Sequence, residues 1–389
     1  QPFILPVILL VGGLYFTIRT GGIQIRMFKE CLRVVTEKPK TENGISSFGA
    51  LMVSTASRVG TGNIIGVATA VICGGSGAIF WMWLSAFLGG ASAFIESTLA
   101  QIYKKKNADG SSYGGPAFYM RDALNARWLG VIFSVLIIFT YAIGYNMLAA
   151  FNLQSTFQVF SFYGDRTPAI IGVILAALFG AVVIGGAHRL VKVTGVLVPV
   201  MGIIYVAISL IVLVLNIGNV PAMFAGIFKN AFDFQAIFGG FAGSCIMFGI
   251  KRGLYSNEDG MGSAPNAAAT ADVSHPVKQG LVQMLSVFID TMLICTATAF
   301  MCLSTNIIPQ NYLGADGSAD AAGYVQAATA STLGKFGPIF IAFAMCLFAF
   351  TTLIGNYSYC EGCIRFIIQR DIKPGELLAF RLFATALVF

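Results

Sequence analysis

The residues best suited to bind small charged ligands form a Gly-Thr-Gly-Asn segment at 60–63, in the middle of an apolar run over 47–73. Two glycines weaken a helix at such a point. In a membrane, the freed backbone groups of a broken helix persist only where they line a polar site. The N–H groups that begin the outer half, near Thr61, would suit a carboxylate, and the carbonyls that end the inner half, near Ala56 and Val59, would suit a cation. The same glycines are equally typical of close packing between two helices.

A second apolar run, over 236–271, carries two bases and two acids between glycines: Lys251, Arg252, Glu258 and Asp259. Charges at membrane depth are expensive and usually face a partner or a water-filled cavity. If the run is one continuous helix, Lys251 and Glu258 are seven residues apart and share a face. An equally good interpretation is that these charges mark the point where the helix approaches the cytoplasm.

Three isolated charges and a pair of hydroxyls lie in other apolar runs. The charges are Arg58, Glu96 and Asp290. Arg58 either pairs with an acid as an inner gate or anchors the inner half-helix, and the sequence favours neither. The hydroxyls of Thr351 and Thr352 fall in the run over 336–364. On pattern alone, each would bond the carbonyl four residues back in its own helix.

The composition requires that these residues be held by membrane-embedded helices. Of 389 residues, 57% are hydrophobic and 11% are charged, against about a quarter charged in a soluble domain. The net charge of +7 could indicate nucleic-acid binding, but the basic residues lie in short loops between apolar runs, as membrane topology requires. The eight cysteines lie mostly inside apolar runs, where we interpret them as packing residues.

Runs of roughly 20 apolar residues, the length that crosses a bilayer, predict an entry helix, eight core spans and a last span that is cut off. These runs are 3–19, 47–73, 77–104, 127–152, 167–187, 190–216, 236–271, 280–304, 336–364 and a run from about 376. Because the sequence starts at Gln1 and stops inside an apolar run at Phe389, we expect the native chain to extend at both ends.

The loops between these runs differ sharply in charge. Most Lys and Arg residues outside the runs fall in the loops 19–46, 104–127, 187–192, 272–279 and 364–375. The opposite loops hold Arg166, Lys229 and Lys335. Because basic loops remain in the cytoplasm, the first core span is predicted to start there and run outward. On the outer side, the loop 305–335 is either a plain surface loop or contains a short helix that acts as a lid.

The two interrupted runs are the first and the sixth of the core. Two repeats of five helices would each begin at these positions. Inverted repeats whose first helix is broken, with binding at the midplane, are a known plan for transporters.

Several sequence blocks resemble the alanine or glycine:cation symporter family (sodium:alanine symporters), within the amino acid–polyamine–cation superfamily. The resemblance covers nearly the whole chain. Its strongest blocks are Arg58-Val59-Gly60-Thr61-Gly62-Asn63-Ile64-Ile65-Gly66-Val67-Ala68, Gly77-Ala78-Ile79-Phe80-Trp81-Met82-Trp83 and Gly114-Gly115-Pro116-Ala117. The most specific are Lys251-Arg252-Gly253-Leu254-Tyr255-Ser256-Asn257-Glu258 and Gly260-Met261-Gly262-Ser263-Ala264-Pro265, with His275-Pro276 following.

The resemblance implies an all-α polytopic membrane protein with the leucine-transporter-like fold, a five-plus-five inverted repeat and an extra N-terminal helix, with the last core helices truncated here. The implied parts are an extra transmembrane helix (1–19), a cytoplasmic connector (20–46), a first repeat (47–216), an extracellular connector (217–235) and a second, truncated repeat (236–389).

The resemblance also implies positions for the ligands. Thr61 and Gly62 would hold the substrate carboxylate with Asn63 beside them, and Phe248 and Tyr255 would form the sixth-span side of the pocket. Sodium would lie between the first and eighth spans. Its ligands would be the carbonyls of Ala56, Val59 and Phe348 and the hydroxyls of Thr351 and Thr352.

Two positions depart from the family pattern. Ala149, in the third core span, stands where members usually have a Gln. The pocket would therefore be larger, with one polar partner fewer, and Ala149 would face the substrate. Asp259 stands where an Ala is usual, which adds a carboxylate without an assigned role.

The expected function is sodium-driven uptake of an alanine-like or glycine-like amino acid by alternating access. A different or larger amino acid is the alternative, because of Ala149. An ion channel is less favoured because no repeated filter-like carbonyl loop occurs, and an intramembrane enzyme is disfavoured because no catalytic set converges. The expected partners are a small neutral amino acid, sodium as coupling ion and the lipid bilayer. No cofactor, nucleic acid or protein partner is expected. The expected location is the plasma membrane (the inner membrane if bacterial).

Overall fold

Helices dominate the described chain, because a backbone in hydrocarbon must satisfy its hydrogen bonds within each segment. The computed structural model describes residues 4–39, 41, 44–107, 111–233, 245–368 and 374–388. The helices of the first half are α1 (Ile4–Arg19), α2 (Ile23–Arg26), α3 (Phe28–Val35), α4 (Ser47–Arg58), η1 (Gly62–Gly66), α5 (Val67–Gly74), α6 (Ala78–Ile102), α7 (Pro116–Leu124), α8 (Arg127–Ile137), η2 (Ile138–Gly144), α9 (Tyr145–Thr156), α10 (Thr167–Val183) and α11 (Gly186–Leu215). Those of the second half are η3 (Ile217–Asn219), α12 (Val220–Ala231), α14 (Cys245–Asn257), α15 (Ala264–Thr270), α16 (Pro276–Val287), η5 (Phe288–Cys295), α17 (Thr296–Leu303), η6 (Pro309–Tyr312), α18 (Ala321–Leu333), α19 (Phe336–Ile368) and α20 (Pro374–Ala386). In the same described ranges, the strands β1 (Lys105–Lys106) and β2 (Ser112–Tyr113) form an antiparallel hairpin.

Five continuous helical segments of the described chain are long and apolar enough to cross a membrane: α6, residues 127–156, α11, residues 276–303 and α19. The bent pair of α4 and the helix Gly62–Gly74 makes a sixth. The predicted spans 3–19 and 167–187 are helical, but α1 and α10 have 16 and 17 residues. At about 1.5 Å per residue they are roughly 24–26 Å long, slightly less than the hydrocarbon thickness of about 30 Å.

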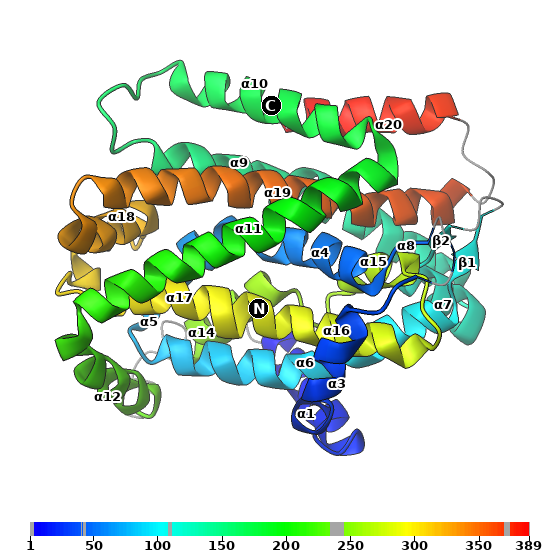
Figure 1. The fold of residues 1–389 in the computed structure, drawn as a ribbon, viewed down its shortest axis with the longest axis horizontal. Helices are drawn as coiled ribbons and strands as arrows, with labels where there is room; N and C mark the ends of the chain where they lie inside the picture. Colours follow the sequence, from blue (N-terminus) through cyan, green and yellow to red (C-terminus); the bar gives the residue numbers. More distant parts are fainter. Residues whose placement is uncertain are drawn as a thin grey trace.

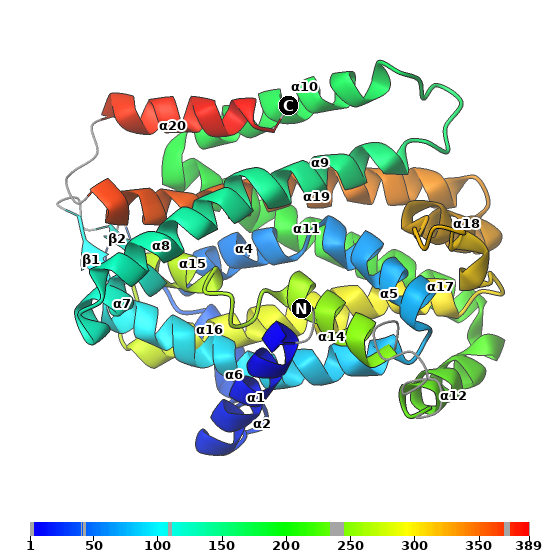
Figure 2. The same ribbon diagram turned by 180° about the vertical axis from the view of Figure 1, so that it is seen from behind.

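The broken helices lie in the middle of the molecule. Figures 1 and 2 show α4, α5 and α14 between a layer that contains α11 and α19 and a layer that contains α6 and α16. α10 and α20 pack together at one edge, and α1 to α3 lie at the opposite edge. The core is therefore built around the segments in which the sequence places its polar residues.

The predicted break in the first core span is confirmed. α4 ends at Arg58, and the helix that follows is bent from it by 53°. The Gly60 N–H donates to the Asn63 side chain at 2.8 Å, so the side chain replaces a helical carbonyl as acceptor. The alternative of close packing also holds, because a Cβ at Gly60 would lie 2.1 Å from the Thr352 hydroxyl on α19.

The sixth core span is also broken. α14 ends at Asn257 and α15 begins at Ala264. Glu258 has a φ of 54°, so the expected helical face shared by Lys251 and Glu258 is wrong. Glu258 and Asp259 are 2% and 1% exposed, which shows that these acids are buried in the break and do not mark a surface. The predicted beginning of this span, 236–244, lies outside the described residues.

The connectors contain helices of their own. Residues 20–46 include α2 and α3, and residues 217–235 include η3 and α12. Of the two interpretations of the loop 305–335, the short helix is confirmed as α18. Within the predicted cytoplasmic loop 364–375, residues 369–373 lie outside the described residues.

Candidate functional site

A small cavity of about 20 Å³ lies between the two breaks. It is lined by Ser57, Arg58, Gly60, Thr61, Gly62, Tyr145, Ala149, Tyr255, Ser256, Glu258 and Thr352. Of the six predicted substrate residues, four line this cavity: Thr61, Gly62, Ala149 and Tyr255. Phe248 and Asn63 do not. We call this space the central cavity.

The Thr61–Gly62 wall is the start of a helix. The first turn of a helix leaves its backbone N–H groups without intrahelical acceptors, and the helix dipole makes that end positive. The Thr61 hydroxyl accepts a hydrogen bond from Asn152 at 3.1 Å. A Cβ at Gly62 would lie 2.9 Å from the Tyr255 ring. That ring packs edge-on against the ring of Tyr145, with 5.2 Å between the ring centroids. Only glycine at position 62 allows the ring to approach the helix end this closely.

Asn63 faces away from the central cavity. Its Nδ2 donates to Asp290 Oδ1 at 2.6 Å, and its Oδ1 accepts from Gly60. Ser256 and Thr291 each donate to Asp290 Oδ2 at 2.9 Å. The structure therefore uses Asn63 to shape the break and tie it to η5, and does not place its side chain beside Thr61 as expected.

The predicted sodium ligands are only partly brought together. Thr352 lines the central cavity, and its buried hydroxyl has no hydrogen-bond partner in the described chain. The Thr351 hydroxyl bonds the Leu347 carbonyl at 2.9 Å, as the pattern favoured, and lies 3.2 Å from the carbonyl of Phe348, another predicted ligand. Ala56, Val59 and Phe348 are at most 1% exposed and lie outside the lining of the cavity.

Polar residues missed as ligands also line the cavity. The Ser57 hydroxyl lies 3.0 Å from Glu258 Oε1 and 2.7 Å from Asn356 Oδ1, and these two acceptors share its single proton. In the sequence, Ser57 and Ser256 are hydroxyls in apolar runs with nothing that predicts a ligand role, whereas Glu258 stands out as a charge at membrane depth. Of the two interpretations of Arg58, the structure supports pairing with an acid, since its Nη2 lies 3.9 Å from Asp259 Oδ1.

A larger hollow of about 490 Å³ adjoins the central cavity, and we call it the vestibule. Gly62 and Tyr255 line both spaces, so the tyrosine ring forms part of the wall between them. Phe248, Arg252 and Asp320 also line the vestibule. The orientation predicted from loop charges places this hollow on the outer side of the membrane.

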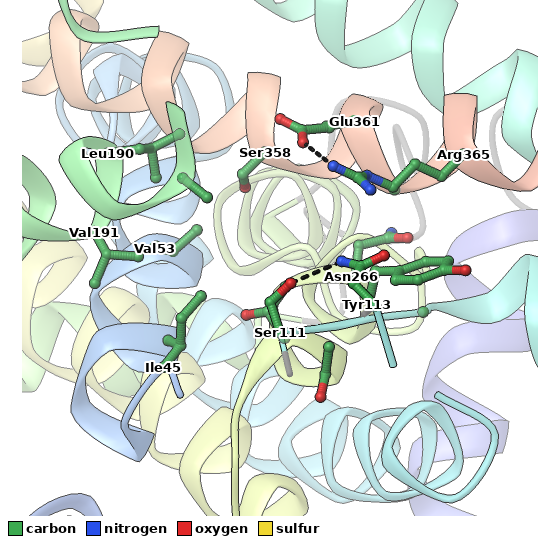
Figure 3. A pocket seen from close by; sticks show the side chains of 16 residues that line it. Ile45, Val53, Ser111, Tyr113, Leu190, Val191, Asn266, Ser358, Glu361 and Arg365 are labelled. Atoms are coloured by element: carbon green, nitrogen blue, oxygen red, sulfur yellow. Dashed lines mark hydrogen bonds and ion pairs between the residues drawn. The ribbon is translucent and has the colours of Figure 1, made fainter. Parts of the chain in front are cut away.

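A third hollow of about 110 Å³ lies near the β1–β2 hairpin (Figure 3). Ile45, Val53, Leu190 and Val191 form its apolar side; Figure 3 shows Glu361 and Arg365 on the other side, joined at 2.9 Å. This pocket shares no lining residue with the central cavity. α4 and α19 separate the two, because a Cβ at Gly355 would lie 2.4 Å from the Ser57 backbone nitrogen.

Known proteins resemble this chain over nearly its whole length. The family model described as "Sodium:alanine symporter family" matches residues 1–389. Amino-acid carrier protein AlsT of Bacillus subtilis (strain 168) is 46% identical over 92% of this chain and 75% of its own length. The probable sodium/glutamine symporter GlnT of the same strain is 45% identical over 94% of this chain and 74% of its own. Sodium/alanine symporter AgcS of Methanococcus maripaludis is 37% identical over 94% of this chain and 81% of its own length.

A solved structure has a similar fold. The crystal structure of MhsT in complex with L-phenylalanine superimposes with a TM-score of 0.56, at 15% identity, over 90% of this chain and 80% of that chain. The likeness supports the leucine-transporter-like class of helical membrane protein. The chain belongs to the sodium:alanine symporter family and is a multi-pass membrane transporter that couples an amino acid to a cation.

Proposed function

We propose that the chain takes up a small neutral amino acid of the alanine or glycine type together with sodium, by alternating access. The observation that carries the proposal is that a helix N-terminus and an unpartnered hydroxyl meet at one break. The start of a helix at Thr61 and the unpartnered Thr352 hydroxyl line the same cavity. One suits an anion and the other suits a cation, so the two ligands of a symporter would be bound side by side.

The substrate carboxylate would accept hydrogen bonds from the backbone at Thr61 and Gly62 and from the Thr61 hydroxyl, whose oxygen accepts from Asn152 and whose own proton can be donated. A helix N-terminus favours anions through its free N–H groups and its dipole. The side chain of the substrate would face Ala149, Tyr145 and Tyr255.

Sodium would bind where α4 ends. The last carbonyls of a helix lack intrahelical donors, and the Gly60 N–H is already used by Asn63. The carbonyls of Ala56 and Val59 are the proposed ligands on this side. Thr352, Thr351 and the Phe348 carbonyl are proposed on α19; a hydroxyl that donates one bond still has lone pairs for a cation.

The proposal also includes how the chain is arranged in the membrane. The chain would be arranged as a five-plus-five inverted repeat, with 1–19 as an extra helix, 20–46 and 217–235 as connectors, and 47–216 and 236–389 as repeats. Two broken spans in the same relative positions support this arrangement. The proposed location is the plasma membrane.

Replacing hydroxyl side chains by valine distinguishes the amino acid site from the sodium site. Thr61→Val should weaken amino acid binding about 5- to 10-fold, and the double change Thr351→Val with Thr352→Val should weaken sodium binding about tenfold or more, because each lost hydrogen bond or ligand oxygen is worth about 1 kcal/mol. Thr194→Val on α11, where the hydroxyl bonds only its own helix, is the control. Binding of labelled alanine and of ²²Na⁺ to purified protein measures both. An equal loss of both ligands in each variant would refute the assignment.

A larger substrate is the second candidate function. Two observations favour it: Ala149 lines the cavity without a polar group, and a relative named as a probable glutamine symporter is 45% identical. Uptake of labelled alanine, glycine and glutamine into vesicles, driven by a sodium gradient or by choline in its place, decides between them. Ion flux that does not saturate would instead indicate a channel.

Ala149→Gln tests how side-chain size is read. The longer side chain fills the cavity, so uptake of the larger amino acid should fall more than uptake of glycine. A methylene in a pocket changes discrimination by about 1–3 kcal/mol, so a change in the glutamine-to-glycine ratio of about tenfold or more is expected. Met147→Gln, at a 60% exposed position of the same helix, should leave the ratio unchanged. If both variants shift the ratio alike, Ala149 does not face the substrate.

A further inference from the structure

We propose that Glu258 binds the ammonium group of the transported amino acid. The inference rests on the proposed function and deepens it, because it identifies what makes the site select a zwitterion over a simple carboxylate. Glu258 was visible in the sequence only as a charge in an apolar run, and its position in the break of the sixth span gives it this role.

The Glu258 carboxylate is buried, oriented and directed at the cavity. Among the described residues that line the central cavity, Glu258 is the one with a carboxylate, and the residue is 2% exposed. The Ser57 hydroxyl, whose proton is shared with Asn356, lies 3.0 Å from Oε1, and Ser263 donates to Oε2 at 2.7 Å. Each oxygen keeps a further lone pair, since an ionised carboxylate accepts about four hydrogen bonds. The two serines therefore hold the group in place and leave capacity for a third donor.

The backbone at Glu258 is adapted to this placement. Its φ of 54° is in the left-handed region, which non-glycine residues rarely adopt and which is often found at functional sites. The residue directly follows the C-terminus of α14, the negative end of a helix. The same cavity thus joins the positive start of one helix, at Thr61, to the negative end of another. That polarity matches the two charged groups of an amino acid.

The charge of Glu258 is not neutralised by an ion pair within the described chain. Arg58 lines the same cavity, but its Nη2 lies 3.9 Å from Asp259 Oδ1 and its Nη1 donates to the Gln283 carbonyl at 3.2 Å. Among the described residues, the hydrogen-bond partners of the Glu258 carboxylate are two neutral hydroxyls. Arg58 acts on the Glu258 charge without a direct contact, and a bound ammonium group supplies the direct ionic partner that a buried carboxylate needs.

Comparison of alanine with propionate, which lacks the ammonium group, provides the test. Competition binding with saturating sodium is measured for the wild-type chain, Glu258→Gln and the control Glu361→Gln, whose carboxylate pairs with Arg365 on α19. Loss of one member of a buried charge pair should weaken alanine at least about 30-fold, while propionate stays within about threefold. The preference for alanine should therefore collapse in Glu258→Gln and persist in Glu361→Gln.

Two further measurements keep the outcomes separate. Ser263→Ala removes one hydroxyl that positions the carboxylate, and should weaken alanine about 5- to 10-fold without affecting propionate; this variant decides the question if Glu258→Gln does not fold. Sodium binding without amino acid should be unchanged in both. A retained preference for alanine, or a loss of sodium binding alone, would overturn the inference. If the wild-type chain binds none of alanine, glycine and glutamine, the proposed function itself fails.

Discussion

Gly60→Ala should raise the sodium concentration that uptake requires, while the protein still folds. The new Cβ would lie 2.1 Å from the Thr352 hydroxyl, a separation that atoms cannot occupy. The hydroxyl has no hydrogen bond to lose, so rotation of the Thr352 side chain is the easiest relief. That rotation removes the hydroxyl from the break, and we expect the sodium concentration for half-maximal uptake to rise about tenfold or more, since a lost ligand oxygen and residual crowding together cost about 1–3 kcal/mol.

The matched control for Gly60→Ala is Gly12→Ala on α1, where a Cβ would have nothing within 4 Å. Sodium dependence of alanine uptake is measured in vesicles for both variants, and thermal unfolding in detergent establishes that both fold. Wild-type sodium dependence in Gly60→Ala would show that the Thr352 hydroxyl is not used as a ligand.

Gly355→Ala should have the largest effect on stability. Its Cβ would lie 2.4 Å from the Ser57 nitrogen and 2.7 Å from the Ser57 Cα. Both atoms belong to the backbone of α4, so no rotamer change relieves the contact. α4 and α19 must separate, which also stretches the 2.7 Å bond from Ser57 to Asn356. Overpacking costs about 1–3 kcal/mol, and we expect a lower unfolding temperature together with loss of uptake.

The same Gly12→Ala variant controls for the general effect of alanine in a membrane helix. Gly355→Ser extends the series, because its larger side chain should lower the unfolding temperature further. An unfolding temperature for Gly355→Ala equal to that of Gly12→Ala would contradict the close approach of α4 and α19.

Segment-level features could be predicted because they follow from runs of apolar residues. Outside the two breaks, the predicted runs are largely helical where the structure describes them, and two glycines beside Thr61 and Asn63 correctly predict the first break. The second break was less accurately predicted. Its charges indicate an unusual segment but not where the helix ends. The positive φ at Glu258, Gly260 and Gly262 shows that the helix stops at Asn257.

Side-chain directions could not be predicted, because they depend on how each helix is rotated in the packed molecule. Thr351 and Thr352 are adjacent, and successive residues of a helix are about 100° apart around its axis. Only the approach of Gly60 shows that Thr352 faces the break. Likewise, Asn63 turns to Asp290, which is far away in the sequence, and no local pattern identifies that partner.

The central claim is that an amino acid and a cation bind at the same break and stabilise each other. It is tested by equilibrium binding of alanine, glycine and glutamine to the purified chain, with sodium varied at constant ionic strength. We predict that sodium raises the affinity for at least one of them, and that this amino acid raises sodium affinity by the same factor, as linkage requires. If the affinity for every amino acid is unchanged by sodium, the claim is contradicted.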